Sequence, residues 1–291
     1  MIETSIIVPT FNSAKYAQTL IDSILNQTID NYEVIIVDNH SNDDTINAIK
    51  KKNNNDKRFR YFSIFNNGVI AKSRNHGIDN ARGNYLAFHD SDDSWVKDKL
   101  EVSILYLKNY DFTYHRVRVS NNKNIFDRRV MHSYQLSNYK NNVFIDLMTK
   151  GNPIDLSSVV CKKEIFNDVR FTESKKFITV EDFECWIQLS IKGVKFKRIN
   201  KVLGHYFLSG FNTSLTFSNS PYKFMHIANK YKNMLKDEKD IIFSKNIFRY
   251  FVAVYVNNKK TKRKYFSYLF FSKIHKLKLK IFIRFILSFF L

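Results

Sequence analysis

Four short apolar runs, separated by segments with helical spacing, constrain what this chain can fold into. The apolar runs predict strands over residues 5–8, 32–38, 60–64 and 85–89. The segments between them carry apolar residues at helical intervals, which predicts helices over residues 14–26, 44–52 and 69–81. Strands and helices that alternate in this way are joined by right-handed crossovers and form a parallel sheet. The predicted fold class is therefore α/β.

Polar side chains follow three of the four predicted strands. Thr10 and Asn12 follow the first strand, Asp38 follows the second, and Asp90 and Asp92 follow the fourth. Ligands of parallel sheets collect at the carboxyl ends of the strands, so we expect these groups to meet at one edge. A lone carboxylate there can accept hydrogen bonds from a base or a ribose. The edge suits a sugar nucleotide or a nucleoside triphosphate.

The segment YLAFHDSDDSW, residues 85–95, places Asp90, Asp92 and Asp93 within four positions. Carboxylates this close repel one another and are costly to desolvate, which favours a nearby cation. Mg²⁺ or Mn²⁺ typically takes one or two carboxylates together with substrate phosphates, and Asp90 and Asp92 are spaced to do this. The alternative interpretation is a solvated acidic turn. The sequence contains no G-x-x-x-x-G-K-[ST] or G-x-G-x-x-G loop that would cradle phosphate with its backbone.

Four sequence blocks occur in order over the first hundred residues: IVPTFN (7–12), VDNHSNDDT (37–45), NGVIAKSRNHG (67–77) with ARGNY (81–85), and FHDSDDSW (88–95) followed by Lys99 and Leu100. Together these blocks resemble family 2 glycosyltransferases with the GT-A fold. The blocks occur in the order found in that family. The resemblance implies a GT-A-type, Rossmann-like, mostly parallel sheet flanked by helices.

The same resemblance implies roles for individual residues. Thr10, Asn12 and Asp38 would contact the nucleoside, and Asp90 would face the ribose and diphosphate. Asp92 would bind Mn²⁺ or Mg²⁺, with Asp90 as the second candidate ligand. The full set of candidate nucleotide-binding residues is Pro9, Thr10, Asn12, Asp38, Arg74, Asp90 and Ser91.

The match departs from the family at Asn39 and His40, where family members usually carry Asp and Gly. The departure leaves Asp38 in place and leaves its contacts with the base open.

A second acidic pair occurs in the segment VEDFECWIQLS, residues 180–190. Its apolar residues mark one face of a helix whose first turn holds Glu181 and Asp182. Acids in a first turn interact favourably with the helix dipole, so a capping role is one interpretation. The segment also resembles the family's E-D-x-x-x-W block, which implies that Asp182 is the general base, with Glu181 as the reserve candidate.

The middle of the chain has a less regular pattern. We predict a helix over 96–108, strands and loops over 112–143, a helix over 142–149, and strands over 156–161 and 194–199. The segment 204–214 resembles the flexible loop after the family's last core strand, although Ser209 stands where members often have His. We expect one glycosyltransferase domain over residues 1–215. Its nucleotide-binding half would be residues 1–108 and its acceptor half residues 109–215.

The net charge of +20 is concentrated at the C-terminus: residues 257–291 contain ten Lys or Arg and no Asp or Glu. The same segment is rich in Phe and Tyr, a mixture that suits an anionic bilayer surface better than nucleic acid. We predict helices over 221–236 and 240–256 and a helical, basic and aromatic region over 216–291 that associates with a membrane. The alternative is a terminal helix that packs on its own domain.

The N-terminus lacks the features of a signal peptide, and no apolar run reaches the ~20 residues of a membrane span. The only two cysteines are expected to be reduced and buried. These features favour a cytoplasmic protein that is peripheral at the inner face of a bacterial membrane.

These expectations combine into one function. The chain would be an inverting, metal-dependent glycosyltransferase that moves a hexose from a nucleotide-sugar to a lipid-linked saccharide in O-antigen, capsule or lipopolysaccharide synthesis. The family resemblance implies that the donor is a UDP-sugar. No nucleic-acid partner is expected. One rival is a nucleotidyltransferase, which usually has a Gly-rich loop after the first strand. The other is a catalytically idle membrane- or nucleic-acid-binding protein on the same fold.

Overall fold

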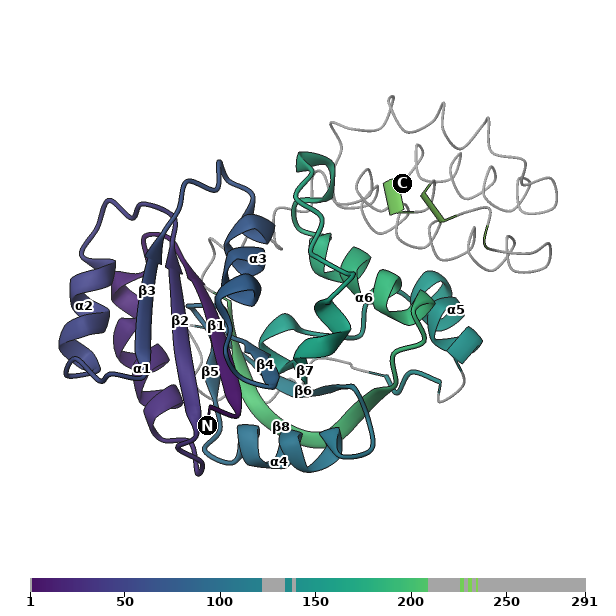
Figure 1. The fold of residues 1–291 in the computed structure, drawn as a ribbon, viewed down its shortest axis with the longest axis horizontal. Coiled ribbons are helices and arrows are strands. Elements are labelled where there is room, and N and C mark those ends of the chain that lie inside the picture. Colours follow the sequence, from purple (N-terminus) through teal and green to yellow (C-terminus); the bar gives the residue numbers. More distant parts are fainter. Residues whose placement is uncertain are drawn as a thin grey trace, which may run out of the picture. The chain divides into compact units, whose positions relative to one another are not determined.

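The computed structural model describes residues 2–121, 134–137 and 140–208, together with residues 226, 227, 230, 231 and 234. The chain divides into two compact units, Met1–Thr216 and Phe217–Leu291. The first unit contains the labelled sheet and helices of Figure 1. The helices predicted beyond residue 216 and the basic tail lie almost entirely outside the described residues.

Within the described residues, the strands form one eight-stranded sheet with the order β3-β2-β1-β4-β7-β6-β8-β5. The strands are β1 (Thr4–Thr10), β2 (Tyr32–Asp38), β3 (Phe59–Ser63), β4 (Tyr85–Phe88), β5 (Ser94–Trp95), β6 (Phe112–Asn121), β7 (Val160–Lys162) and β8 (Phe196–Leu208). Strand β1 pairs in parallel with β2 and β4, and β2 pairs in parallel with β3. The parallel arrangement predicted from the four apolar runs is confirmed.

The other half of the sheet is mixed. Strand β7 runs antiparallel to both β4 and β6, β5 runs antiparallel to β8, and β6 and β8 are parallel. The sheet is therefore mostly parallel, as predicted, with two antiparallel insertions. Because β5 has only two residues, no apolar run in the sequence marks it.

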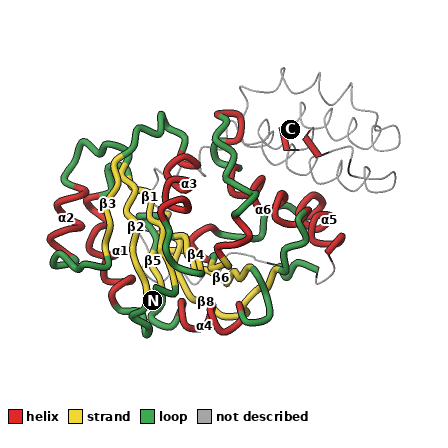
Figure 2. The backbone as a smooth tube through the Cα atoms, in the orientation of Figure 1, coloured by secondary structure: helices red, strands yellow, loops and turns green. Residues whose placement is uncertain are grey.

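Helices flank the sheet (Figure 2). They are α1 (Ala17–Leu25), α2 (Thr45–Lys52), α3 (Ile70–Asn80), α4 (Lys99–Leu107), α5 (Lys140–Lys150) and α6 (Glu181–Ile191). Short 3₁₀ turns include η2 (Leu156–Ser158). Among the described residues, no helix combines the length and the apolar character needed to cross a membrane.

Strand β1 is buried on both faces, which explains its unbroken apolar run. Ile6 and Val8 belong to the core cluster that also contains residues of α1 and α2. Ile7 points to the opposite face, where Gly77 of α3 lies so close that an added Cβ would overlap the Ile7 side chain. Alternation along the strand thus places α1 and α2 on one face of the sheet and α3 on the other.

Two predicted strands and one predicted loop differ most from the structure. The strand predicted over 156–161 is the turn η2 followed by the three-residue strand β7. The strand predicted over 194–199 continues as β8 to Leu208, so the first residues of the predicted loop 204–214 are part of the sheet. Gly204 allows this, because it pairs with Trp95 of β5, and a Cβ there would lie 3.1 Å from the Ser94 carbonyl oxygen. The rest of that loop, with Ser209, lies outside the described residues.

Candidate active site

The loops after β1 and β2 are joined through the carboxylate of Asp38. Its Oδ1 accepts hydrogen bonds from the hydroxyls of Thr10 (3.0 Å) and Ser41 (2.6 Å), and its Oδ2 accepts one from the Ser41 backbone N–H (2.9 Å). Thr10 and Asp38 are both buried. The structure therefore brings together two residues that the sequence predicted at one edge of the sheet.

Asn12 and Ser91 extend this edge in two directions. Asn12 has a positive φ of 49°, and its Oδ1 accepts a hydrogen bond from the Asn42 backbone N–H at 2.8 Å. The Ser91 hydroxyl lies 2.8 Å from the hydroxyl of Ser13, directly after the β1 loop. The predicted nucleoside loops are thus linked to the loop that carries the acidic motif. Pro9, inside β1, pairs with Val37 of β2.

His40 occupies the position where the resemblance to family 2 glycosyltransferases implies Gly. Its φ is 50°, in the left-handed region that glycine adopts most easily. Its ring lies 5.4 Å from the ring of Phe65, between centroids, which places two aromatic groups at the ends of β2 and β3. Asn39 accepts a hydrogen bond from the Asn66 backbone N–H at 2.9 Å. The family's Asp and Gly are replaced by residues that join neighbouring loops.

Asp90 and Asp92 are half-buried in the loop after β4. Burial, and then the charge of Asp90, raise the pKa of Asp92 to about 6. A divalent cation between the two carboxylates would remove this repulsion. Among the described residues, no three His, Cys, Asp or Glu side chains form a ready metal site. The pair fits an ion whose other ligands come from a substrate diphosphate, the pattern typical of Mg²⁺.

Asp93, the third acid of the motif, points into the protein. It is 2% exposed, and it accepts hydrogen bonds from the Ser157 hydroxyl (2.5 Å) and the Phe207 backbone N–H (3.3 Å). The same Ser157 oxygen accepts a hydrogen bond from the Asp90 backbone N–H at 3.0 Å. Asp93 therefore anchors the acidic loop to η2 and β8.

The buried side chains of His89, Trp95 and Lys99 pack against one another beside the acidic loop. His89 lies with its ring centroid 4.2 Å from that of Trp95, and the Lys99 ammonium lies 3.5 Å from the Trp95 ring centroid. His89 Nδ1 is 2.8 Å from the Asp90 carbonyl oxygen and therefore carries the proton, so its Nε2 accepts from the hydroxyl of Ser23. Burial lowers the pKa of His89 to about 3, which keeps it neutral.

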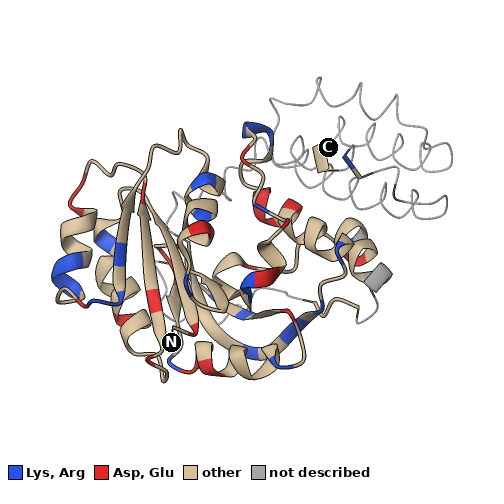
Figure 3. Cartoon of the chain, in the orientation of Figure 1, with Lys and Arg blue, Asp and Glu red and all other residues tan. Residues whose placement is uncertain are grey.

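The second acidic pair, Glu181 and Asp182, lies at the start of α6. Figure 3 shows Asp and Glu in red, including those on α6. Glu181 is buried, and its Oε1 accepts a hydrogen bond from Arg74 Nη1 at 2.6 Å. Asp182 is half-buried and accepts hydrogen bonds from the Phe183 backbone N–H (2.7 Å) and the Asn152 amide (3.1 Å). One Asp182 oxygen thus contacts a backbone N–H within the first turn of α6, while the N-cap residue, Val180, makes no side-chain capping hydrogen bond.

Burial, and then the charge of Glu181, raise the pKa of Asp182, while Arg74 acts in the opposite direction. A carboxylate with a raised pKa is a stronger base. Because Glu181 is held in an ion pair and Asp182 is more accessible, Asp182 is the better placed of the two to accept a proton.

Asp155 also belongs to this acidic site, and no sequence pattern distinguished it. It stands at the N-cap of η2, yet its side chain makes no capping hydrogen bond. Its Oδ1 is buried and lacks a hydrogen-bond partner. Burial, and then the charges of Asp90 and Asp182, raise its pKa. A single Asp before a short apolar run carries no recognisable signal, so only the fold shows its neighbours.

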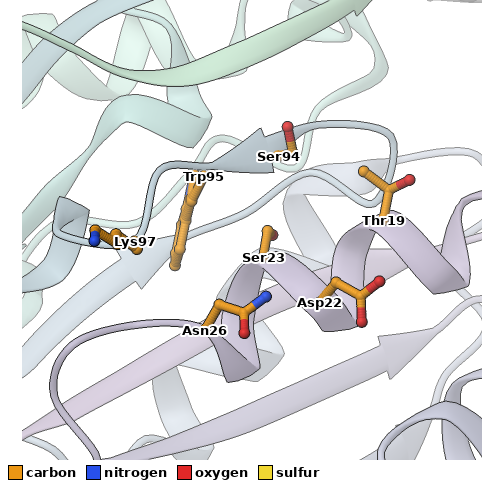
Figure 4. A pocket seen from close by; sticks show the side chains of 7 residues that line it. All are labelled: Thr19, Asp22, Ser23, Asn26, Ser94, Trp95 and Lys97. Carbon is orange, nitrogen blue, oxygen red and sulfur yellow. The ribbon is translucent and has the colours of Figure 1, made fainter.

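An open hollow lies between α1 and β5 (Figure 4). Trp95, Ser94 and Lys97 line one side of it, and the other side is lined by Thr19, Asp22, Ser23 and Asn26. None of the candidate site residues lines this hollow.

A parallel sheet with polar loops at its carboxyl edge, an acidic loop after β4 and a second acidic pair on a later helix is the arrangement of the GT-A fold. The family model described as glycosyl transferase family 2 matches residues 5–166. This match covers more than half of the chain, so the chain belongs to glycosyl transferase family 2.

Two relatives illustrate the range of matches. An uncharacterized glycosyltransferase of Rickettsia felis is 34% identical over 194 residues, which are 65% of this chain and 30% of that protein. The UDP-Glc:alpha-D-GlcNAc-diphosphoundecaprenol beta-1,3-glucosyltransferase WfgD of Escherichia coli is 28% identical over 187 residues, 64% of this chain and 68% of that protein. The match with the Rickettsia proteins spans 30% of their length.

Solved structures share the fold. TarS of S. aureus in complex with UDP has a TM-score of 0.63 and 20% identity, with 90% of this chain and 74% of that chain covered. The mannosyltransferase PcManGT of Pyrobaculum calidifontis, in complex with GDP-Man and Mn²⁺, has a TM-score of 0.58 and 15% identity, with 88% of this chain and 74% of that chain covered. The predicted GT-A fold is confirmed.

Proposed function

We propose that this chain is an inverting, metal-dependent hexosyltransferase that uses a nucleotide-sugar donor. The observation that carries the proposal is that the site contains two acidic groups suited to different tasks. The half-buried pair Asp90 and Asp92 suits a metal–diphosphate, and Asp182, whose pKa is raised by burial, is suited to accept a proton. The charges of Asp90 and Asp182 both act on Asp155, which supports a single shared site.

The chemistry follows from what an acceptor hydroxyl requires. The hydroxyl is a weak nucleophile, and its proton must leave as the new glycosidic bond forms, so Asp182 acts as the general base. A divalent ion at Asp92 and Asp90, when bound, would stabilise the charge that develops on the departing nucleoside diphosphate. Attack from the side opposite the leaving group inverts the anomeric carbon. An α-linked donor would therefore give a β-glycoside.

The names of similar proteins support the choice of substrates. WfgD is named for a UDP-glucose donor and a diphosphoundecaprenol-linked acceptor. TarS was solved with UDP, and the Pyrobaculum enzyme with Mn²⁺. We propose a UDP-hexose donor, Mn²⁺ or Mg²⁺, and a lipid-linked saccharide acceptor of surface-polysaccharide synthesis. A peripheral position at the inner face of a bacterial membrane, through residues 216–291, is part of the same proposal.

The test is nucleotide release from a panel of sugar nucleotides, with a synthetic lipid-diphosphate sugar as acceptor and with either Mn²⁺ or EDTA. We expect turnover of a UDP-sugar that EDTA abolishes. Asp92→Ala and Asp182→Ala should each lower turnover by at least about 100-fold, the lower end of what a general base or a charge-stabilising group contributes. Absence of binding and turnover with every donor would refute the proposal and favour a binding protein on this fold.

A further inference from the structure

Arg74 lies in the middle of α3 and contacts both acidic groups of the site. Its Nη2 is 3.1 Å from Asp90 Oδ1, and its Nη1 is 2.6 Å from Glu181 Oε1. Asp90 belongs to the loop after β4, and Glu181 is the first residue of α6. One guanidinium therefore connects the loop proposed to bind the donor diphosphate with the helix proposed to carry the base.

The surroundings of Arg74 keep it charged and fixed in place. Arg74 is 4% exposed, and burial alone would lower the pKa of its guanidinium, but the charges of Asp90 and Glu181 more than reverse this effect. The guanidinium carbon lies 5.7 Å from the ring centroid of Phe171. The planar fork of arginine can bind two carboxylates at once, which a lysine ammonium cannot do with the same geometry.

Each terminal nitrogen of Arg74 donates to a protein carboxylate, one in the loop after β4 and one on α6, so the guanidinium is fixed between these two elements. Glu181 depends on the same contact, because its Oε2 is buried and has no hydrogen-bond partner. Removal of Arg74 would leave a buried, uncompensated carboxylate at the start of α6, which is strongly unfavourable. The first turn of α6 would rearrange, and Asp182, the next residue, would move with it.

We propose that Arg74 is a positioning residue that holds the base-bearing turn of α6 in register with the acidic loop after β4. The expected loss of kcat rests on the proposed function, whereas the expected loosening of the first turn of α6 does not depend on it. The positioning role of Arg74 differs from the nucleotide contact that the family resemblance implies.

The kinetic test compares Arg74→Met and Arg74→Lys with a matched control, Arg60→Met. Arg60 also pairs with a buried glutamate, Glu33, at 2.9 Å, but the two lie away from the acidic site. A displacement of about 1 Å near the reacting groups can cost about 100-fold in rate. We therefore expect Arg74→Met to lower kcat by about 100-fold and to change the donor KM by less than about threefold.

Arg74→Lys should recover part of the lost rate because it keeps the charge, and Arg60→Met should leave kcat unchanged. A raised donor KM with kcat unchanged in Arg74→Met would instead make Arg74 a nucleotide-binding residue and overturn the proposal. Equal losses of kcat in Arg74→Met and Arg60→Met would also overturn it, because they would indicate a general loss of stability.

A structural readout separates this proposal from the proposed function. Hydrogen exchange of the backbone amides of residues 182–185 needs no substrate. We expect faster exchange there in Arg74→Met, or in Arg74→Lys if the Met variant does not fold, and unchanged exchange in Arg60→Met. Unchanged exchange in both Arg74 variants would refute the positioning role. If the wild type turned over no donor while Arg74→Met loosened α6, only the proposed function would fail.

Discussion

At the scale of single residues, the acids of this site differ in what they contact, although three of them are neighbours in sequence. Asp93 is enclosed by Ser157 and the Phe207 backbone, whereas Asp92 is half-buried and crowded by Asp90. Glu181 and Asp182 differ in the same way, since the first is held in a buried ion pair. Adjacent acids can thus have separate structural and chemical roles.

The raised pKa of Asp182 predicts the pH dependence of transfer. A general base acts only when deprotonated, so kcat/KM should fall as the pH drops through the pKa of Asp182. Because burial and Glu181 raise this pKa, the fall should begin well above the ordinary aspartate value of about 4. A pH profile of kcat/KM measures it.

Glu181→Gln provides the control for that profile. This variant removes the negative charge that raises the pKa of Asp182, so its acid limb should move to lower pH whatever happens to the maximal rate. An acid limb that stayed in place would argue that Asp182 is not the titrating base.

The burial of the Lys99 amine predicts that the stability of the protein depends on pH. Lys99 is fully buried, and burial lowers its pKa well below the ordinary value. Between the folded and the unfolded pKa, the unfolded chain binds more protons at this position. The free energy of unfolding should therefore rise with pH across that window and level off near the unfolded pKa of about 10.4. Urea unfolding at several pH values measures this slope.

Lys99→Met keeps an unbranched side chain in the same space and removes the ionisable group. The variant should show a flatter dependence on pH and should be at least as stable as the wild type at pH 7, since no buried charge has to be accommodated. A clear loss of stability at pH 7 would contradict this and would show that the ammonium's contact with the Trp95 ring contributes more than burial costs.

Sequence patterns identified the residues at the strand ends because each follows a buried apolar run. They did not identify Asp155 or the inward orientation of Asp93. The turn η2 places Asp155, its N-cap residue, beside the acidic loop. Asp93 is turned inward by hydrogen bonds from Ser157 and Phe207, which lie far along the chain. Contacts between residues distant in sequence produce no local pattern.

At the scale of elements, the contact between α3 and β1 depends on the absence of a side chain at Gly77. Gly77→Ala would force the new methyl group into Ile7 and should destabilise the fold by about 1–3 kcal/mol, the usual cost of overpacking. Thermal or urea unfolding measures this. Lys72→Ala on the same helix is the control: Lys72 is half-buried, and its truncation adds no atoms that could overlap a neighbour, so stability should change by less than about 1 kcal/mol.

The elements of the first half were predictable because each strand there is a continuous apolar run between two helices. The second half was less predictable. Strand β5 is too short to have a pattern, and β8 includes Gly204, which is unfavourable in a strand on its own. Pairing with β5 and β6 keeps Gly204 in the sheet, so tertiary contacts outweigh local preference at this point.

At the scale of the whole molecule, residues 257–291 predict attachment to anionic membranes. The full chain should sediment with vesicles that contain an anionic lipid and much less with neutral vesicles. Each Lys or Arg near such a surface contributes about 1 kcal/mol. Replacement of Lys259, Lys260 and Lys262 by Gln should therefore weaken binding by at least about tenfold. Equal binding to neutral vesicles would contradict the electrostatic part of this prediction.

The rim formed by the loops after β1, β2 and β3 has a consequence for how such a protein changes over evolutionary time. Side-chain hydrogen bonds of Thr10 and Ser41 with Asp38 connect the last residues of β1 and β2 with the loop after β2. In the proposed function this rim contacts the nucleoside, so a substitution in one of its loops would change the nucleobase contacts while the backbone hydrogen bonds of the sheet stay intact. The proposed nucleotide preference can therefore change within a lineage through exposed loop residues, whereas the buried pair Thr10 and Asp38 is held by the sheet itself.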